Sequence, residues 1–335
     1  MNSKERCFVA IEGGKIDRVP VFPLLMRFAS RRHSVTYRDY VTNGSVMAES
    51  QIRVTENFNV DAITGCSDAF RVSADLGGEM VYPLELPPYL SKPLITCESD
   101  FNRLRKPDYS SPRSRMNDRT RGVSEMVRNA GDHCFVLGWV DMPFAEACSV
   151  CGVSEFMMML YTDPLLAHKI LNFLTGIVID FCLMQLDASA PMIGSGDAAA
   201  SLISPELYRE FALPYEQQVI EAVHSKGGLV KLHICGDTSS LLPYMVKSGA
   251  DLYNVDHMVD LSEALETYNS HLKCTKGNIN PVSAMLHATP EQCSEAARKC
   301  LLLAAEKRFM LSPGCEVPAE ISDETFSAFC NSVLY

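Results

Sequence analysis

The sequence predicts an α/β protein built as a TIM (β/α)8 barrel. Three observations lead to this prediction. Short apolar runs alternate with helix-like stretches along the 335 residues. The runs number eight, which is the number of parallel strands that closes such a barrel. Most of the runs end in polar or reactive side chains, as expected where the functional residues of a barrel gather.

The eight expected strands are short and rich in β-branched, aromatic and other apolar residues. Because helical stretches separate them, they should pair in parallel, with all their carboxyl ends at one end of the barrel. The expected strands are Val19–Leu24, Val60–Thr64, Phe135–Val140, Met192–Gly194, Leu229–Ile234, Leu252–Val255, Cys274–Asn278 and Phe309–Ser312.

The stretches between the strands have helical periodicity, and several begin with a helix-starting signal. Ser204 and Thr289 are each followed by proline and glutamate, a pattern typical of an N-cap and a first turn. The expected helices are Gly44–Glu56, Val153–Leu160, Leu165–Leu186, Pro205–Ser225, Ser239–Ser248, Ser262–Asn269 and Pro290–Lys307.

One segment, from about Arg71 to Asp118, breaks this alternation. It is rich in proline and contains short β-like pieces, so we expect an insertion after the second strand, near the barrel mouth. No internal repeat or low-complexity linker divides the sequence. Residues 1–335 are therefore expected to form a single domain.

The composition is typical of a soluble protein with a sizeable core, since 47% of the residues are hydrophobic and 21% are charged. A formal net charge of −11 argues against nucleic acid or an anionic membrane surface as the main partner. The longest apolar stretch, Ile170–Leu186, is interrupted by Asn172, Asp180 and Gln185, so we expect a buried helix and no membrane span. No apolar signal region follows the first residues, and the expected location is the cytoplasm.

The chain has 13 cysteines. They are scattered, odd in number and without the spacing of a disulfide framework, so reduced and mostly buried thiols are expected. Cys148 and Cys151 form a lone Cys-x-x-Cys pair between helical flanks, which favours a structural role. Cys293 and Cys300 are seven residues apart on an expected helix and fit one buried face.

The fifth expected strand ends in an unusual pattern, Lys231-Leu-His233-Ile-Cys235. Successive side chains of a strand point to opposite faces. The intervening residues are apolar and suit packing against the outer helices, so Lys231, His233 and Cys235 should face the barrel interior. Packing alone does not explain a strand that turns these three side chains inward.

Cys315 follows a Pro-Gly turn at the end of the last expected strand, on the same rim as His233 and Cys235. One imidazole and two thiolates supply three of the four ligands of a tetrahedral zinc site and leave one position open. A substrate atom can take that position. The sequence therefore predicts a chemically active Zn²⁺ site with His233, Cys235 and Cys315 as its protein ligands.

Other strand ends supply candidate contacts to a substrate. Asp197 follows the fourth run, Asp256 and His257 follow the sixth, and Asn278 ends the seventh. Each of them is also explained by the polar turn that ends a strand, and a structural role stays open for His257. We expect the four side chains to contact a substrate or to orient His233.

Four segments resemble the uroporphyrinogen decarboxylase superfamily, and the resemblance covers essentially the whole chain. It implies a TIM barrel. Within that superfamily, His233, Cys235 and Cys315 match the zinc pattern of the methylcobalamin:coenzyme M methyltransferase branch. The four segments are Glu5–Pro20, Ile203–Tyr215, His233–Gly236 and Gly277–Pro281.

This resemblance implies a methyl-transfer reaction. A thiol acceptor would bind zinc, lose its proton and attack the methyl group of a methylated corrinoid such as methylcobalamin. A corrin is too large for the barrel to enclose, so a separate corrinoid protein is the implied partner. Coenzyme M is the acceptor that the resemblance suggests, with Lys231, Lys276 and Arg27 as candidates for a basic pocket around its sulfonate.

Alternatives stay open. The acceptor could be tetrahydrofolate or homocysteine, or the protein could run demethylation in the opposite direction. Another alternative is a zinc-free decarboxylase. That enzyme binds the carboxylates of its substrate with several basic residues in an N-terminal segment. The corresponding segment here, Leu24–Ser30, has only one basic residue, Arg27. The last alternative is a non-catalytic barrel that binds a corrinoid protein without turnover.

Overall fold

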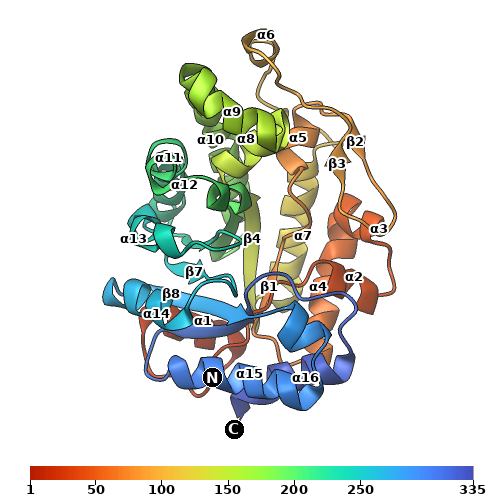
Figure 1. Cartoon of the computed structure of the whole chain (residues 1–335). Helices are drawn as coiled ribbons and strands as arrows, with labels where there is room; N and C mark the ends of the chain where they lie inside the picture. Colours follow the sequence, from red (N-terminus) through yellow and green to blue (C-terminus); the bar gives the residue numbers. More distant parts are fainter. Residues whose placement is uncertain (335) are drawn as a thin grey trace.

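Seven parallel strands form the sheet of the protein in this computed structural model, which describes residues 1–334. The sheet curls into a barrel, with most of the helices packed around it (Figure 1). Seven of the eight expected strands are confirmed, and so is the TIM-barrel fold. In spatial order the strands are β1 (Ala62–Thr64), β4 (Phe135–Asp141), β5 (Met192–Gly196), β6 (Leu229–His233), β7 (Leu252–Asn254), β8 (Cys274–Ile279) and β9 (Phe309–Pro313).

The first expected strand, Val19–Leu24, lies between β9 and β1 but pairs only in part. Phe22 N donates to Leu311 O over 2.9 Å, and on the other side Asp61 N donates to Val21 O over 2.8 Å. Pro20 and Pro23 have no N–H group, so the segment cannot form a regular ladder. It closes the barrel through isolated bridges instead.

A buried carboxylate fastens this closing segment to β1. The side chain of Asp61 is fully buried and accepts from Val21 N over 2.7 Å. It also accepts from Arg6 Nη1 over 2.6 Å and from Arg18 Nη1 over 2.7 Å. Because both guanidinium groups and one backbone N–H converge on it, this single carboxylate joins the N-terminal helix, the closing segment and the start of β1.

The helices follow the expected order, with one break. The expected helix Pro205–Ser225 divides at Ala212, because Pro214 lacks an N–H group and its ring opposes a continuous helix. Ser239–Ser248 consists of 3₁₀ turns around a short helix. The helices are α1 (Ser3–Glu12), α2 (Arg27–Arg32), α3 (Tyr37–Thr42), α4 (Gly44–Asn57), α5 (Arg71–Asp75), α6 (Glu98–Phe101), α7 (Arg115–Ala130), α8 (Pro143–Cys151), α9 (Val153–Thr162), α10 (Pro164–Asp187), α11 (Pro205–Phe211), α12 (Leu213–Ser225), α13 (Leu242–Met245), α14 (Leu261–Ser270), α15 (Pro290–Leu303) and α16 (Asp323–Asn331).

Helix α10 contains the longest apolar stretch. By length and composition it could cross a membrane, yet Ile170, Leu174, Ile177 and Phe181 are buried in the core. The helix packs against α8 and α12. It is therefore built as the buried helix that the sequence predicts, while the cytoplasmic location stays a prediction.

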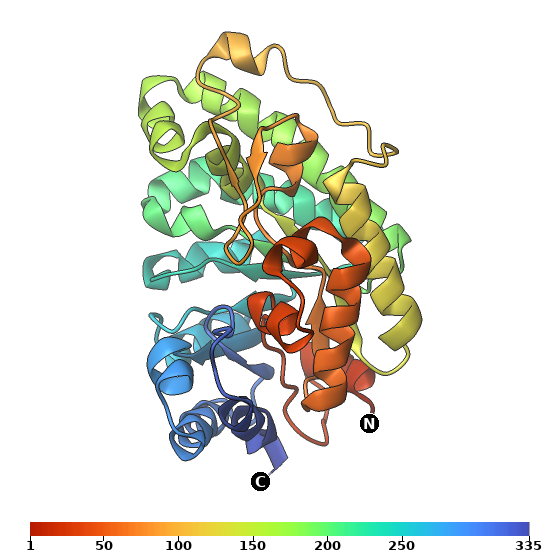
Figure 2. The ribbon, with the colours of Figure 1, turned by 90° about the vertical axis from the view of Figure 1, so that its right-hand side faces the viewer.

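The predicted insertion, 71–118, carries α5, α6 and a small antiparallel hairpin made of β2 (Met80–Val81) and β3 (Tyr89–Leu90). Figure 2 shows this stretch running beside the N-terminal helices. Its last residues, from Arg115, already belong to α7, so the excursion is shorter than predicted. The assignment of residues 1–335 to a single domain stays a prediction.

Substitution of Asp61, the carboxylate that fastens the closing segment to β1, should weaken the whole fold. The variant Asp61→Asn is expected to lower the free energy of unfolding by about 3–5 kcal/mol, because two arginines lose their buried partner. Urea unfolding followed by circular dichroism measures the change. Asp187→Asn, on a side chain with 73% exposure, serves as the control and should change stability by less than about 1 kcal/mol. Equal stability of the two variants would contradict the structural role of Asp61.

Candidate metal centre

Three soft donors meet at the carboxyl-terminal end of the barrel. His233 is the last residue of β6, Cys235 follows it by two positions, and Cys315 lies just beyond β9. Cys235 Sγ is 3.0 Å from His233 Nε2 and 3.7 Å from Cys315 Sγ. All three ligand atoms lie within 4.8 Å of one another.

The donor atoms fit a tetrahedral zinc ion. With zinc–sulfur bonds of about 2.3 Å, two sulfur ligands of a tetrahedron lie about 3.8 Å apart. The observed Sγ–Sγ distance of 3.7 Å agrees with this value. Gly236 follows Cys235 in the left-handed region at φ 87°, which glycine adopts without strain, so the chain can turn away directly after the ligand.

The imidazole of His233 is already oriented for a metal. Its Nδ1 lies 3.0 Å from the backbone oxygen of Asn254. A carbonyl can only accept, so Nδ1 carries the proton and Nε2 keeps its lone pair. A ligand histidine is typically fixed in this way by a bond through its other nitrogen.

Two buried lysines lie inside the barrel. Lys231 Nζ stands 4.2 Å from the centre of the Trp139 ring and has no hydrogen-bond partner among residues 1–334. Lys276 Nζ donates to Asn254 Oδ1 over 2.9 Å. Burial lowers the pKa of Lys231 to about 8 and holds the pKa of Lys276 well below its usual value.

These lysines fit only part of the predicted basic pocket. Lys276 is already bonded to Asn254, and the guanidinium of Arg27 lies 3.7 Å from Glu320. Of these three basic residues, Lys231 is the one with no hydrogen bond and no salt bridge to a carboxylate in the described chain, and its charged neighbours are thiols.

The two thiols interact directly. The hydrogen bond from the Cys235 thiol lowers the pKa of Cys315, and the neighbouring His233 lowers it further. The same contact raises the pKa of Cys235, which the nearby ammonium of Lys231 opposes. The pair therefore holds one thiolate readily, as a site for a soft cation requires.

Asp256 and His257 form a dyad beside the thiols. Asp256 Oδ1 lies 2.8 Å from His257 Nδ1, and Asp256 Oδ2 accepts from Gly236 N over 3.0 Å. Asn278 donates through Nδ2 to the backbone oxygens of Asp256 and Val259, over 3.1 and 2.7 Å. Its amide thus shapes this loop, and contact of these side chains with a substrate stays a prediction.

Asp197 occupies a different environment from the donor cluster. It is fully buried after β5, and Oδ1 accepts from Ala145 N over 2.8 Å. Burial and the adjacent Glu216 raise the pKa of Asp197 well above its usual value. Burial raises the pKa of Glu216 to about 7, and Glu216 accepts from the hydroxyl of Tyr208. Contact of Asp197 with a substrate also stays a prediction.

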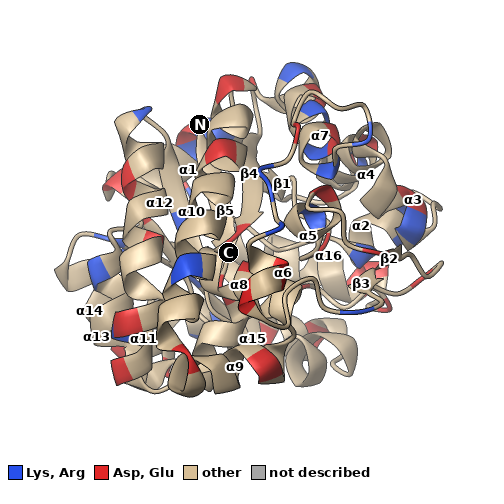
Figure 3. Cartoon of the chain, turned by 90° about the horizontal axis from the view of Figure 1, so that it is seen from above, with Lys and Arg blue, Asp and Glu red and all other residues tan. Residues whose placement is uncertain are grey.

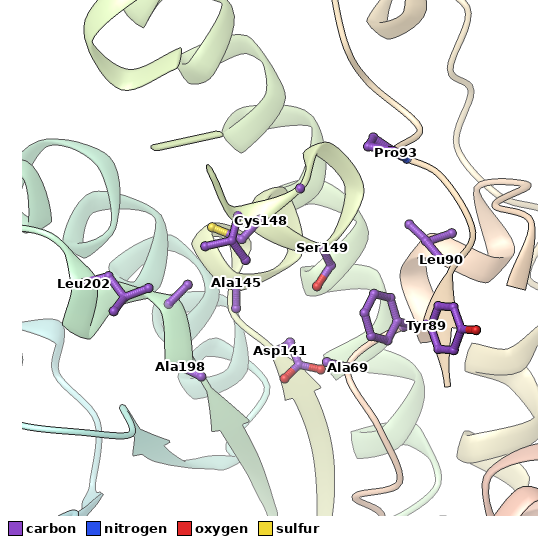
Figure 4. Close-up of a pocket in the computed structure, with 14 residues that line it drawn as sticks. Ala69, Tyr89, Leu90, Pro93, Asp141, Ala145, Cys148, Ser149, Ala198 and Leu202 are labelled. Atoms are coloured by element: carbon purple, nitrogen blue, oxygen red, sulfur yellow. The ribbon is translucent and has the colours of Figure 1, made fainter. Parts of the chain in front are cut away.

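A cavity of about 510 Å³ opens at the ends of β1, β4 and β5. Figure 4 shows Asp141 at the tip of β4, between Ala69 and Ala198. Asp141 pairs with the buried Arg71, and burial raises the pKa of Asp141 to about 6. The lining residues are Ala69, Phe70, Tyr89, Leu90, Pro93, Asp141, Ala145, Cys148, Ser149, Gly152, Val153, Ala198, Ala199 and Leu202.

Sequence reasoning did not find this cavity. Its aromatic walls are Phe70, just before α5, and Tyr89 in the β2–β3 hairpin, and neither position carries a chemical signature in the sequence. Cys148, expected to be structural, is buried in α8 and touches the cavity. The position of the insertion hairpin was the missing information, because it brings Tyr89 over the ends of the strands.

Comparison with known proteins settles the family. The family model for uroporphyrinogen decarboxylase (URO-D) matches residues 2–334. The chain belongs to the uroporphyrinogen decarboxylase family. The resemblance seen in the sequence is confirmed.

Relatives in this family are named for methyl transfer or for decarboxylation. The "Methylcobamide:CoM methyltransferase MtbA" of Methanosarcina acetivorans is 25% identical over 94% of this chain and 92% of its own. A "Uroporphyrinogen decarboxylase" of Chlorobium phaeobacteroides is also 25% identical, over 87% of this chain and 85% of its own. Identity alone therefore does not choose between the two reactions.

A solved structure confirms that the fold is shared. A methyltransferase from Methanosarcina mazei superposes with a TM-score of 0.84 at 18% identity, over 99% of this chain and 98% of that chain.

Figure 3 shows acidic and basic residues interspersed over the helices in the view from above, in keeping with the net charge of −11.

The buried acid pair should make stability depend on pH. The native state holds the Glu216 proton up to a pKa of about 7, whereas the unfolded chain releases it near 4.3. Stability should therefore fall as the pH rises from about 4.5 to 7, by an amount of the order of 3 kcal/mol. Glu216→Gln should remove the part of this fall that Glu216 contributes, while Asp197, whose pKa burial also raises, keeps its own part.

Urea unfolding at several pH values measures this effect. Glu221→Gln, on an exposed side chain of the same helix, is the matched control and should keep the wild-type pH dependence. A Glu216→Gln variant with an unchanged pH profile would show that Glu216 does not hold its proton up to neutral pH.

Metal analysis tests the donor cluster. The purified wild type is expected to hold about one zinc ion per chain, and Cys235→Ser should lose most of it, because a thiolate ligand is replaced by a weak hydroxyl. Cys97→Ser, at an exposed thiol, should keep the wild-type content. Plasma emission spectrometry gives the ratio of zinc to protein. Equal zinc in both variants would exclude Cys235 as a ligand.

Proposed function

We propose that this protein is a zinc-dependent methyltransferase that moves a methyl group from a methylated corrinoid, carried by a partner protein, to a thiol acceptor such as coenzyme M. The cluster of His233, Cys235 and Cys315 is the observation that carries this proposal. It supplies three protein ligands at the functional end of the barrel and leaves a fourth position for the acceptor sulfur. Bound zinc would lower the pKa of that sulfur and keep it nucleophilic at neutral pH.

The residues around the cluster support an anionic sulfur. Two ligand thiolates and a neutral imidazole balance the double charge of zinc, so an acceptor thiolate adds one net negative charge. The ammonium of Lys231, buried on the same strand and without a hydrogen-bond partner among residues 1–334, supplies a compensating positive charge. Asn254 holds His233 in the tautomer that a ligand needs.

The cavity at β1, β4 and β5 suits the approach of the methyl donor. Its walls are mostly apolar, with Asp141, Ser149 and Tyr89 as the residues that carry polar side-chain atoms, so they limit the water in the path of the methyl group. Tyr89, Val153 and Leu202 line it while remaining partly exposed to solvent. We assign these three side chains to the surface on which the corrinoid protein docks.

The same cavity disfavours the decarboxylase reaction. A substrate with many carboxylates needs several Arg or Lys side chains around it, and none of the described residues that line the cavity is basic. Other acceptors, tetrahydrofolate or homocysteine, and demethylation in the opposite direction remain variants of the same zinc chemistry. A non-catalytic barrel would bind the corrinoid protein without consuming methylcobalamin.

Loss of the methylcobalamin absorbance on addition of a thiol tests the function. We expect the zinc-loaded wild type to demethylate methylcobalamin with coenzyme M, and Cys315→Ser to be at least about 100-fold slower, because the metal centre is lost. Cys97→Ser should react at the wild-type rate. Homocysteine and tetrahydrofolate in parallel assays identify the acceptor. Full activity of a metal-free wild type, or of Cys315→Ser, would contradict the zinc mechanism.

A further inference from the structure

The loop that follows β7 touches the residue next to each cysteine of the metal centre. On one side, Asp256 Oδ2 accepts from the backbone N–H of Gly236, the neighbour of Cys235. On the other side, the backbone of His257 packs against Gly314, the neighbour of Cys315. A Cβ atom on Gly314 would come within 2.4 Å of His257 N. The Asp256–His257 dyad is thus held between the two thiol-bearing turns.

Within this loop the imidazole of His257 has one committed nitrogen and one free nitrogen. Nδ1 lies 2.8 Å from Asp256 Oδ1, and the carboxylate fixes the proton on Nδ1. Nε2 then carries a lone pair, and the side chain is 32% exposed. Asp256 is itself held rigidly, because Oδ1 also accepts from Met258 N over 3.1 Å and its backbone oxygen accepts from Asn278.

The other carboxylates on the turns around the dyad, Asp237 and Glu316, each accept hydrogen bonds through one of their two oxygens. Asp237, two residues after Cys235, accepts from Ser239 through both the backbone and the hydroxyl. Glu316, next to Cys315, accepts from Arg27 N over 2.8 Å. The remaining groups on these turns are the three metal ligands themselves. His257 Nε2 has no hydrogen-bond partner among the described residues, and its side chain belongs to the loop that contacts both thiol-bearing turns.

We infer that His257 accepts the proton of the thiol that binds at the metal centre, with Asp256 as its positioning residue. The S–H bond breaks, an Nε2–H bond forms, and the electron pair stays on sulfur. The imidazolium that forms is stabilised by the Asp256 carboxylate and keeps the proton while the thiolate stays bound at the metal centre. This inference rests on the proposed function, because it requires a thiol to bind the metal centre.

Proton release on thiol binding tests this role without relying on turnover. Coenzyme M is titrated into the zinc-loaded protein by calorimetry, in two buffers of different ionisation enthalpy, at pH values between about 6 and 8. The wild type should release clearly less than one proton to the buffer near pH 7, because His257 keeps part of it. His257→Gln, which can still bond to Asp256 through its amide, should release close to one proton throughout that range.

Rate measurements add a second readout. Single-turnover methyl transfer by His257→Gln is expected to slow by about 100-fold at pH 7, and less at higher pH, where solvent takes the proton. Asp256→Asn should cause a similar loss, since an amide favours the wrong tautomer of His257. His271→Gln, at an exposed histidine, and the zinc content of every variant serve as controls.

The outcomes separate the two proposals. A wild type that holds zinc but binds no thiol overturns the proposed function, and this inference with it. Thiol binding with the same proton release in wild type and His257→Gln overturns the assignment of His257 alone. Reduced release in the wild type, restored to about one proton in His257→Gln with zinc retained, supports it.

Discussion

Closure of the parallel barrel is the constraint on which the metal centre depends. Cys235 and Cys315 are 80 residues apart in the sequence, and their sulfur atoms come within 3.7 Å only because β6 and β9 belong to one closed sheet. The closing segment, Val19–Leu24, contains two prolines and cannot hold itself in place through a full ladder. Asp61 makes up for the missing ladder bonds by tying that segment to β1 and to two arginines.

The two ends of the barrel differ in how well their polar groups are satisfied. At the amino-terminal end, the carboxylate of Asp61 has donors for both oxygens. At the carboxyl-terminal end, nitrogen atoms of Arg71 and one oxygen of Glu146 are buried without a hydrogen-bond partner. Unsatisfied groups cost free energy. Their gathering at the rim that holds the thiols and the cavity follows the division of a TIM barrel into a stabilising and a functional end.

Periodicity was sufficient to predict most of the fold and the inward position of His233, while Cys315 was proposed from its place after the last strand, and the role of the three donors as ligands stays a prediction. Apolar runs located the strands, and alternation along β6 placed His233 and Lys231 inside the barrel, where both are buried. The first expected strand was predicted as a regular strand, but it pairs only through isolated bridges. Its apolar pattern does not show that Pro20 and Pro23 lack the N–H groups that a regular ladder needs. Pro214 divided a helix for the same reason.

The polar neighbours of the donors could not be assigned from the sequence. A strand-end position does not reveal which hydrogen bonds a side chain will make, so Asn278 and Asp197 could not be distinguished from substrate contacts. In the structure Asn278 bonds to backbone oxygens, and Asp197 packs against Glu216. The cavity was invisible for a different reason, since its walls come from separate segments that only the folded chain brings together.

Charge balance links the metal centre to the barrel interior beneath it. A thiolate at the fourth position would place a net negative charge in a region of low dielectric, where an uncompensated charge is costly. Lys231 lies on the same strand as His233, and its ammonium stands over the face of Trp139 and near the thiols of Cys235 and Cys315, so it can compensate that charge without breaking a salt bridge to a carboxylate. A buried lysine without a carboxylate partner is costly in a protein that never binds an anion there. The barrel interior is therefore prepared for the anionic state of the acceptor more than for its neutral thiol.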